Sequence, residues 1–445
     1  MSLPKTTLEW LNSHQLDYRI RRQTSVGDVC AQAFLLKHSR GRLYAVIPSG
    51  SFLDLAQLES VTEVDLAPLN QKEWDVIQQD TDCLTLPALP TLTRIPAVVD
   101  KKLLSQPSVS VDSGDPDLLI QLDGEDFTRL WHQPTPADIS APVILEDSQD
   151  TQRDGEQIDR SITNFTSFRI RQRLSETIEI PPLSDTASRI LSMRSDPSSS
   201  LAKLSAIVET DPSLAAQIIR WANSALYGVS GQVRSVEDAI IRVLGSELVI
   251  NLALGLCLGN SLKIRNSGID INSFWVQSIL CAKAMESLVD MIPGDFRPAR
   301  ETAYLVGLFH RFGYLVLAHV FPPHFALVER HLAVNPGIHH HSIEKHLLGV
   351  TREQINAWLM RDWNLPNDIC TALRQVHNGT GNHYAKLCFV ACHLLHEQGM
   401  CERPMSALTE DHLDSLHLSL EDARRVLERM IASAPDFIQF AHAFS

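Results

Sequence analysis

The chain has 445 residues, of which 44% are hydrophobic and 21% charged, and its formal net charge is −14. A chain of this length and composition holds two or three globular domains, each large enough to bury a core. The acidic balance argues against a nucleic-acid or anionic-membrane surface as the main role, although it leaves room for a local basic patch.

No export signal or spanning segment is predicted. The opening residues, MSLPKTTLEW, have no basic flank followed by an apolar stretch, so no signal peptide is expected. The most apolar run, Leu248 to Leu258, is too short to cross a bilayer and predicts a buried core helix. The eight cysteines form no CxxC pair and are expected to be reduced thiols of a cytoplasmic protein.

Residues 1 to about 132 alternate between strand and helix patterns, which predicts an α/β domain. Two apolar runs, Ala33–His38 and Leu43–Pro48, flank the segment Ser-Arg-Gly-Arg, and this arrangement predicts a hairpin. The other expected elements are one helix and three strands: Leu55–Val61, then Ala97–Val99, Val109–Val111 and Leu118–Leu122.

A change of composition separates this domain from the rest. Residues 133–163 are rich in Pro, Asp and Ser with one weak apolar patch, and are interpreted as a solvated linker. Residues 164–445 are predicted to be almost entirely helical. Asp211-Pro212 predicts a helix start, because Asp accepts from exposed N–H groups and Pro suits the first turn. Ser235 with Asp238 predicts a second start, and Gly245 the end of that helix.

Several segments of the C-terminal half follow one another with the order and spacing of a known family. They are IPPL at 180–183, SDP at 195–197, ETDPSLAAQIIRWANSALYG at 209–228, SVEDAIIRVLG at 235–245, FW at 274–275, GLFH at 307–310 and WNLP at 363–366. Residues 164–445 therefore resemble an HDOD domain, with its core at 168–380 and a C-terminal helical extension. The resemblance implies an all-α fold and a bacterial regulatory protein.

The longest of these segments carries Trp221, Asn223, Ser224 and Tyr227. An Asn and a Ser at a helix end can satisfy exposed carbonyl groups, so these residues are interpreted as a structural joint. The alternative is a docking surface for a ligand or partner, for which His310 and Arg311 are further candidates.

The HDOD fold is similar to that of the HD phosphohydrolases, which hold divalent metal with histidines and adjacent His-Asp pairs. By resemblance, those metal-binding positions fall on the following residues: Gln277, His310, Arg311, Arg352, His377 and Asn378. A guanidinium beside His310 would oppose a dication. The sequence therefore predicts no metal, no cofactor and no hydrolysis, and it makes His310 and His377 hydrogen-bonded core residues.

Two other groups of residues could hold metal. Cys388, Cys392 and His396 lie four residues apart, next to His393, and would share one helix face. Core packing is preferred for this set, because cysteine packs as a small hydrophobe. The tract His339 to His341 is expected to be an exposed loop that binds metal only adventitiously.

The N-terminal segments carry a second resemblance. AQAFLL at 31–36, LYAVIP at 43–48, LDL at 53–55, IPAVVDKKL at 95–103 and the stretch from Leu118 to Trp131 are similar to the YbaK/ProX-type aminoacyl-tRNA deacylase domain. The resemblance implies a mixed sheet, a strand lysine that positions the ester, and a glycine-containing loop whose N–H groups stabilise charge in the transition state. Here the lysine position falls on Gln32, Lys37 would point to the other face, and residues 83–96 contain no glycine. The deacylase chemistry is therefore predicted to be missing.

Three functions follow from these patterns. The preferred one is a non-catalytic signal-transduction protein that binds signalling or regulatory proteins, or a small-molecule ligand, and does not contact a membrane. The first alternative is aminoacyl-tRNA deacylation by the N-terminal domain, with tRNA as the partner. The second alternative is metal-dependent phosphohydrolysis by the helical domain.

Overall fold

The computed structural model describes residues 3–22, 30–91, 95–131, 134–144, 153–162, 183–194, 200–224, 227, 231–260, 262, 269–377, 379–402, 404 and 406–432. The chain forms two compact units. The N-terminal unit comprises Met1–Asp147 and Ala326–Leu347, and the helical unit comprises Ser148–Phe325 and Leu348–Ser445. The sequence had assigned residues 326–347 to the helical domain; instead they pack with the N-terminal unit, where Val334 joins an apolar core.

The N-terminal unit combines strands and short helices. Its strands are β1 (Arg19–Arg22), β2 (Cys30–His38), β3 (Gly41–Pro48), β4 (Ser51–Leu53), β5 (Ala67–Pro68), β6 (Ala97–Asp100), β7 (Ser108–Asp112), β8 (Leu118–Asp123), β9 (Thr135–Ala137) and β10 (Ser140–Pro142). Its helices before residue 147 are α1 (Lys5–Ser13), α2 (Leu55–Thr62), α3 (Gln71–Thr81), α4 (Lys101–Leu104) and α5 (Gly124–Leu130).

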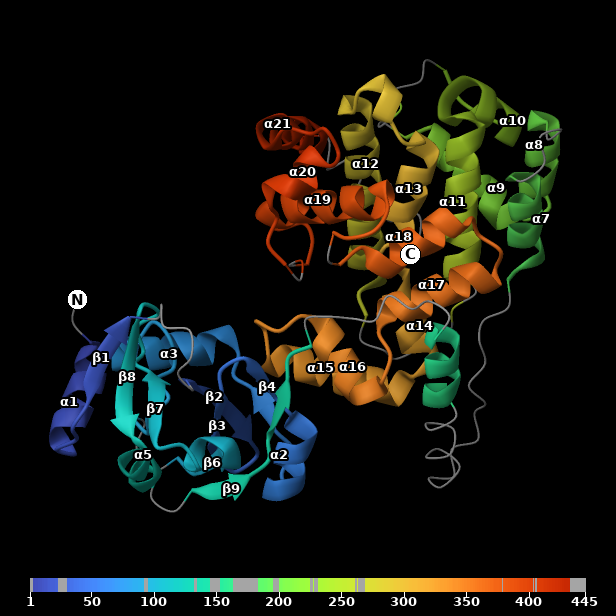
Figure 1. Ribbon diagram of the computed structural model, residues 1–445. Coiled ribbons are helices and arrows are strands. Elements are labelled where there is room, and N and C mark those ends of the chain that lie inside the picture. The colour runs from blue at the N-terminus through green and yellow to red at the C-terminus, as the bar shows by residue number, and fades with distance from the viewer. Residues whose placement is uncertain are drawn as a thin grey trace. The chain divides into compact units, whose positions relative to one another are not determined.

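The strands form an eight-stranded sheet in the order β1-β8-β7-β2-β3-β6-β9, with β5 paired to β2 (Figure 1). The expected hairpin is confirmed: β2 and β3 pair antiparallel from Ala31 opposite Pro48 to His38 opposite Gly41. On either side of the hairpin, β7 runs parallel to β2 and β6 runs parallel to β3. The sheet is therefore mixed, as predicted.

Both faces of the sheet are buried, and β3 shows why. Tyr44 and Val46 lie in one apolar cluster, while Leu43, Ala45 and Ile47 lie in another. Successive side chains of a strand point to opposite faces, so a continuous apolar run fills two cores at once.

The prediction of a solvated linker over 133–163 does not hold for two of its parts. Residues 135–142 contain β9 and β10, and β10 pairs with β4. Ile139 is fully buried: its N–H donates to Asp100 Oδ2 at 3.1 Å, and its carbonyl accepts from the Asp54 N–H at 2.8 Å. Residues 153–162 form a helix whose Asp154 is buried. The apolar residues between the prolines of this segment lie in or between strands β9 and β10, which composition alone does not reveal.

The described residues of the helical unit and of the segment that leaves it contain helices and connecting loops but no strand. The helices include α7 (Asp185–Arg194), α8 (Leu201–Glu209), α9 (Pro212–Ala222), α10 (Val236–Ala239), the π-helix η2 (Ile240–Leu244), α11 (Gly245–Asn260), α12 (Ile271–Met291), the 3₁₀ helix η3 (Gly294–Phe296), α13 (Arg300–Phe309), α14 (Phe312–Val320), α15 (Pro322–Val334), α16 (His340–Leu348), α17 (Arg352–Asp362), α18 (Asn367–Gln375), α19 (His383–Glu397), α20 (Glu410–Asp414) and α21 (Leu420–Ile431).

Local signals of the sequence place several helix ends. Asp211 accepts from the N–H groups of Ser213 and Leu214 at the start of α9. Ser235 accepts from the Asp238 N–H at the start of α10, and Gly245 takes a positive φ of 76° where the π-turn ends. These starts and this stop are confirmed. Short polar side chains accept hydrogen bonds from the free N–H groups of the first turn, and glycine adopts a positive φ without steric cost.

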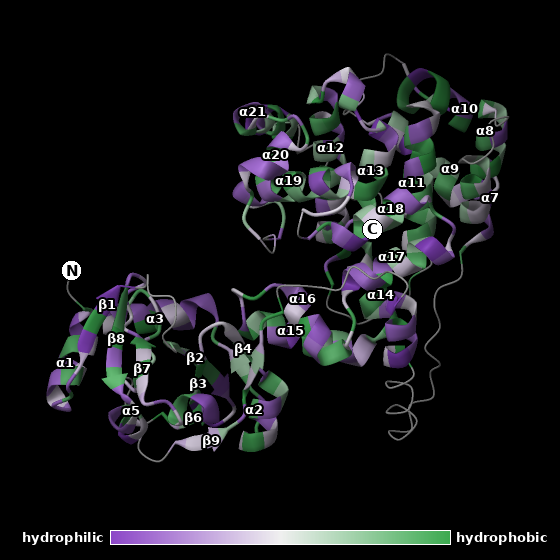
Figure 2. Cartoon of the chain, in the orientation of Figure 1, coloured by the Kyte–Doolittle hydropathy of each residue, from purple (hydrophilic) through white to green (hydrophobic). Residues whose placement is uncertain are grey.

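The most apolar helices form the core of the helical unit, and Figure 2 shows hydrophobic residues along α11 and α13. Among the described residues, Val236–Gly259 and Arg300–Val320 are long and apolar enough to cross a membrane, but 61% and 78% of their most apolar windows are buried inside the protein. The expectation of a buried helix over Leu248–Leu258 is confirmed by α11.

The histidine tract differs from its prediction as an exposed loop. α16 begins at His340, and His341 in its first turn is 0% exposed. A polar composition indicated a loop, whereas the helical position of His341 buries its ring.

Candidate functional site

Three of the positions that correspond to metal ligands in HD phosphohydrolases form one polar network. Arg311, between α13 and α14, donates from Nη1 to Gln277 Oε1 and from Nη2 to Glu402 Oε1. Arg352, the first residue of α17, holds Nη1 4.0 Å from Glu402 Oε2. Because the two guanidinium groups share one carboxylate, the network carries a net positive charge.

Both cations lie near the ring of one aromatic side chain. The guanidinium carbons of Arg311 and Arg352 lie 5.8 Å and 4.8 Å from the ring centre of Tyr314. Such cation–π contacts stabilise a positive charge that has little access to water. The side chains of Arg311 and Arg352 are only 13% and 7% exposed, so the protein stabilises two buried cations at positions that the resemblance predicts for metal ligands.

By the resemblance, His310 falls on the histidine of the His-Asp pair. Its Nδ1–H donates to the Gly307 carbonyl at 2.6 Å, which leaves Nε2 as a lone-pair acceptor. Nε2 is buried and has no hydrogen-bond partner among the described residues. The prediction of a hydrogen-bonded core histidine therefore holds for one ring nitrogen only. His377 is 7% exposed, in keeping with a core position, and Asn378 lies outside the described residues.

Four thiols gather around His310. Cys281 belongs to α12, Cys388 and Cys392 belong to α19, and Cys401 follows α19. Cys281 Sγ lies 3.8 Å from Cys388 Sγ and 3.9 Å from Cys392 Sγ. His310 Nε2 or Nδ1 lies within 4.8 Å of the sulfurs of Cys281 and Cys388, and likewise of Cys392 and Cys401. This group is called the thiol cluster below.

The thiol cluster is held in a protonated state by its own surroundings. The hydrogen bond with the Cys388 thiol raises the pKa of Cys281 well above its usual value, and burial adds to the effect. The contact with Cys392 and burial raise the pKa of Cys401 in the same direction, and His310 only partly opposes them. Without a cation, these groups are neutral thiols at neutral pH.

The sequence identified half of the thiol cluster. It placed Cys388, Cys392 and His396 on one face of a helix, but His396 Nδ1 donates to the Cys401 carbonyl at 3.1 Å instead of joining the sulfurs. Cys281 was missed because it lies 107 residues before Cys388, and Cys401 because it lies beyond the end of α19. One signal was available: Cys281 lies one helical turn after Gln277, on the same face of α12.

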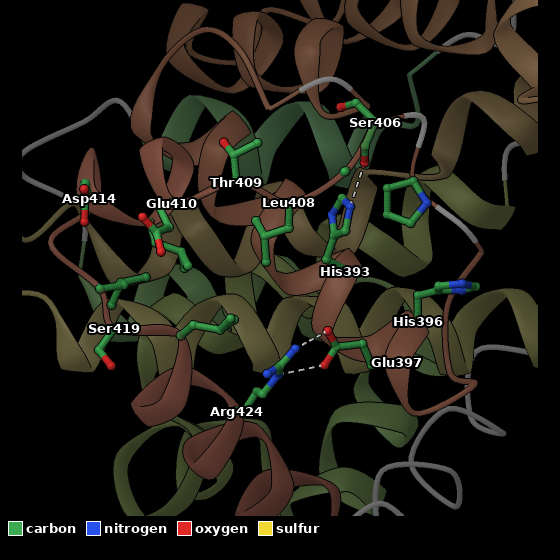
Figure 3. A pocket seen from close by; sticks show the side chains of 15 residues that line it. His393, His396, Glu397, Ser406, Leu408, Thr409, Glu410, Asp414, Ser419 and Arg424 are labelled. Carbon is green, nitrogen blue, oxygen red and sulfur yellow. Dashed lines mark hydrogen bonds and ion pairs between the residues drawn. The ribbon is translucent and has the colours of Figure 1, made fainter. Parts of the chain in front are cut away.

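A separate cavity of about 620 Å³ lies in the C-terminal extension, between α19, α20 and α21. Figure 3 shows Arg424 and Glu397 joined across its floor, with nitrogen-to-oxygen distances of 2.9 and 2.7 Å. His393 Nε2 donates to the Ser406 carbonyl at 2.8 Å and so fastens the cavity rim to α19. None of the positions shared with HD phosphohydrolases lines this cavity.

The candidate docking residues lie at a helix-to-loop joint. The Trp221 side chain is 1% exposed and belongs to the core. Asn223 Nδ2 donates to the carbonyls of Ile219 and Val233, at 2.9 and 2.8 Å, and Asn223 Oδ1 accepts from the Val233 N–H at 2.8 Å. Ser224 and Tyr227 are half-buried. This geometry is the one expected for a structural joint between helix and loop. A docking role for these residues stays a prediction.

In the N-terminal unit, the polar groups at the positions predicted from the deacylase resemblance bond to other groups of the protein. Gln32 Nε2 donates to the Ser51 carbonyl at 3.1 Å, and Lys37 Nζ pairs with Glu73 at 2.7 Å. The N–H groups of Leu84 and Thr85 both donate to the Gly114 carbonyl, at 2.8 and 3.1 Å. These two N–H groups are therefore not available to a substrate carbonyl.

Comparison with known proteins agrees with this architecture. The HDOD domain family model matches residues 180–379. A crystal structure from Marinobacter aquaeolei VT8, described as a "putative signal transduction protein", is 35% identical, covers 100% of both chains and superposes with a TM-score of 0.83. An HDOD domain protein of unknown function from Geobacter sulfurreducens is 18% identical, covers 65% of this chain and 99% of its own, and has a TM-score of 0.52.

Two weaker likenesses concern parts of the chain. A structure described as a "putative trans-editing enzyme for prolyl tRNA synthetase" is 16% identical over 32% of this chain and 99% of its own, with a TM-score of 0.27. An uncharacterized protein of Treponema pallidum (strain Nichols) is 23% identical over 200 residues, which make up 45% of this chain and 38% of that protein. From the full-length match and the family model together, this chain belongs to the HDOD-domain proteins.

Proposed function

We propose that this chain is a non-catalytic regulatory protein of bacterial signal transduction, and that its HDOD domain acts by binding a signalling protein or a small ligand. The observation that carries the proposal is the network of Arg311, Gln277, Glu402 and Arg352. Hydrolysis of a phosphoester by an HD site needs a cation held by neutral imidazole and carboxylate oxygen. Two buried guanidinium groups at those positions repel such a cation.

The full-length relative supports the same role. The Marinobacter aquaeolei VT8 protein carries the description of a signal transduction protein and matches this chain from end to end. Both units of the chain are therefore part of the shared architecture, and the function is one that uses both.

The path of the chain supports coupling between the units. It passes from the N-terminal unit to the helical unit at 147–148, back at 325–326 and forward again at 347–348. α15 and α16 each span one of these crossings. The proposed regulatory role assigns the coupling between the units to these two helices.

Deacylation by the N-terminal unit is the weaker candidate. The amide of Gln32 carries no charge and is bonded to Ser51. Gln32 is the residue at the lysine position, and the N–H groups of Leu84 and Thr85 are engaged. The unit is proposed to keep the scaffold for binding or regulation.

The test uses the purified full-length chain and a His310→Ala variant. Both are assayed with an activated phosphodiester and a phosphomonoester in Mg²⁺ and Mn²⁺, and with a mischarged tRNA. The proposal expects wild type to turn over these substrates no faster than the His310→Ala variant does. In parallel, the chain is isolated from its native cells after cross-linking, with Arg311→Ala as the comparison. A partner that wild type retains and the variant loses supports binding; hydrolysis abolished by His310→Ala overturns the proposal.

A further inference from the structure

We propose that the thiol cluster is a binding site for Zn²⁺, with His310 Nε2, Cys281 and Cys392 as ligands and either Cys388 or Cys401 as the fourth. The site goes beyond the proposed regulatory function and does not depend on it. It replaces the expectation of core packing for Cys388 and Cys392, and the expectation that the chain holds no metal.

The sulfur positions have the dimensions of a zinc site. Tetrahedral Zn²⁺ binds thiolate sulfur at about 2.3 Å, which places neighbouring sulfurs about 3.8 Å apart. Cys281 Sγ lies 3.8 Å from Cys388 Sγ and 3.9 Å from Cys392 Sγ. An iron–sulfur cluster needs room for bridging sulfides between its cysteine ligands, and these separations leave none.

The imidazole has the orientation of a metal ligand. A ligating histidine almost always donates its other ring N–H to a carboxylate or a backbone carbonyl, which fixes the tautomer. His310 Nδ1–H donates to the Gly307 carbonyl at 2.6 Å, its Nε2 is buried without a hydrogen-bond partner among the described residues, and a ring nitrogen of His310 lies within 4.8 Å of the sulfurs. A zinc ion satisfies this otherwise orphaned lone pair.

Close helix packing holds the ligands in place. A Cβ at Gly307 would lie 2.5 Å from the Ala282 Cα, so α13 approaches α12 directly beside Cys281. Cys388 and Cys392 lie four residues apart on α19 and present their sulfurs on one face. Cys281, Cys388 and Cys392 therefore sit on helices, and His310 directly follows one, which is the rigid support that a functional site requires.

The charges also fit a thiolate site. Arg311 repels a bare dication, but Zn²⁺ with three thiolates and an imidazole carries a net charge of −1. Arg311 follows His310 directly, and Glu402, which bridges Arg311 and Arg352, follows Cys401. The two guanidinium groups then compensate the negative centre. Each thiol that binds the ion releases its proton to solvent.

Zinc at this site would join α12, the corner between α13 and α14, α19 and the segment around Cys401. The ion would thus attach the C-terminal extension to the part of the chain matched by the HDOD family model. A disulfide between Cys281 and Cys392 is the competing use of these thiols. It would require their sulfurs, now 3.9 Å apart, to approach to about 2.0 Å.

The test measures zinc in the full-length chain, purified under reducing conditions without a metal-affinity tag. Elemental analysis after gel filtration is expected to find about one Zn²⁺ per chain in wild type, and a loss of most of it in Cys281→Ser and Cys392→Ser. Of Cys388→Ser and Cys401→Ser, one should lose zinc and the other retain it. Cys30→Ser, in the N-terminal unit, and His340→Ala, in the histidine tract, are the controls and should keep the full content.

A second measurement on wild type guards against variants that fail to fold. Replacing the metal with Co²⁺ should give the charge-transfer and visible bands of a tetrahedral cobalt–thiolate site. Removing the metal with a chelator should make at least three more thiols reactive toward a thiol reagent. Absence of these bands together with zinc far below one equivalent after reconstitution overturns the proposal. Equal zinc in wild type and in the Cys281→Ser and Cys392→Ser variants overturns it too. Neither result would touch the proposed regulatory function.

Discussion

His346 Nε2 donates to the Asp54 carboxylate at 2.7 Å, and this contact ties α16 to the start of α2 within the N-terminal unit. The same carboxylate accepts from the Gln57 N–H at 3.1 Å and lies 3.4 Å from His331 Nε2 in α15. Asn335 adds two bonds to the backbone of Leu53, at 2.8 and 3.0 Å. One buried acidic residue thus anchors the segment that leaves the helical unit.

The first prediction concerns the pH dependence of this anchor. Burial by itself raises the pKa of Asp54, but hydrogen bonds from His331, His346 and the Gln57 N–H outweigh it and hold the pKa well below its usual range. A carboxyl with a lowered folded-state pKa stabilises the fold above its unfolded pKa of about 3.9, and the contribution is lost as pH falls toward the folded value. Asp54→Asn should therefore cost about 1.5–3 kcal/mol at pH 7.

Urea unfolding at several pH values checks this expectation. The difference between wild type and Asp54→Asn should stay constant down to about pH 4 and narrow below it. Asp65→Asn, at an exposed position of the same unit, is the matched control and should change stability little at any pH. If wild type and Asp54→Asn differ in unfolding free energy by the same amount at low and neutral pH, the charge of the carboxylate is not the source of the stabilisation.

The second prediction concerns the helix over residues 153–162, which composition had assigned to a linker. Arg374 Nε donates to Asp154 Oδ2 at 2.7 Å, and the two side chains are 3% and 5% exposed. Removing one member of a buried ion pair leaves the other charge uncompensated and costs about 3–5 kcal/mol. Arg374→Ala should lose that much in urea unfolding. Arg160→Ala, which breaks the exposed pair with Glu156, should cost under about 0.5 kcal/mol; similar losses in both variants would contradict the argument.

The sequence predicted those features that depend on neighbouring residues. The β2–β3 hairpin, the capped starts of α9 and α10 and the buried helix α11 all follow from periodicity and from turn or cap residues. It could not predict the path of residues 326–347, because Asp54, His331 and Asn335 meet only through the tertiary fold. Ile139 and Asp154 were hidden for the same reason, since their partners lie far along the chain.

The candidate site was predicted in the same uneven way. Resemblance located Gln277, His310, Arg311 and Arg352, and the structure brings the last two to a common partner, Glu402, that no motif indicated. The cysteines were interpreted one helix at a time. Only the contact between α12 and α19 shows that Cys281 adjoins Cys388 and Cys392.

The third prediction concerns the close approach of α13 to α12. Gly307→Ala places a methyl group 2.5 Å from the Ala282 Cα, and the backbone of one helix must move. Overpacking of this kind costs about 1–3 kcal/mol. The variant should unfold at lower urea and, because Gly307 also accepts the hydrogen bond of His310, it should weaken the binding of Zn²⁺. Gly337→Ala, where an added Cβ meets no atom within 4 Å, is the control and should retain both the stability and the Zn²⁺ binding of wild type. Wild-type stability in Gly307→Ala would refute the packing argument.

The fourth prediction separates a joint from a docking surface at Asn223. Asn223→Asp keeps the shape of the side chain but replaces its N–H donors with a negative charge opposite the carbonyls of Ile219 and Val233. Losing these bonds at an exposed position should cost about 0.5–1.5 kcal/mol in urea unfolding, measured above pH 5 where the new carboxyl is charged. The loss should shrink in acid, because protonation restores a donor. Glu237→Gln, an exposed change nearby, should have little effect. If Asn223→Asp instead keeps full stability and loses a captured partner, the residue belongs to a docking surface.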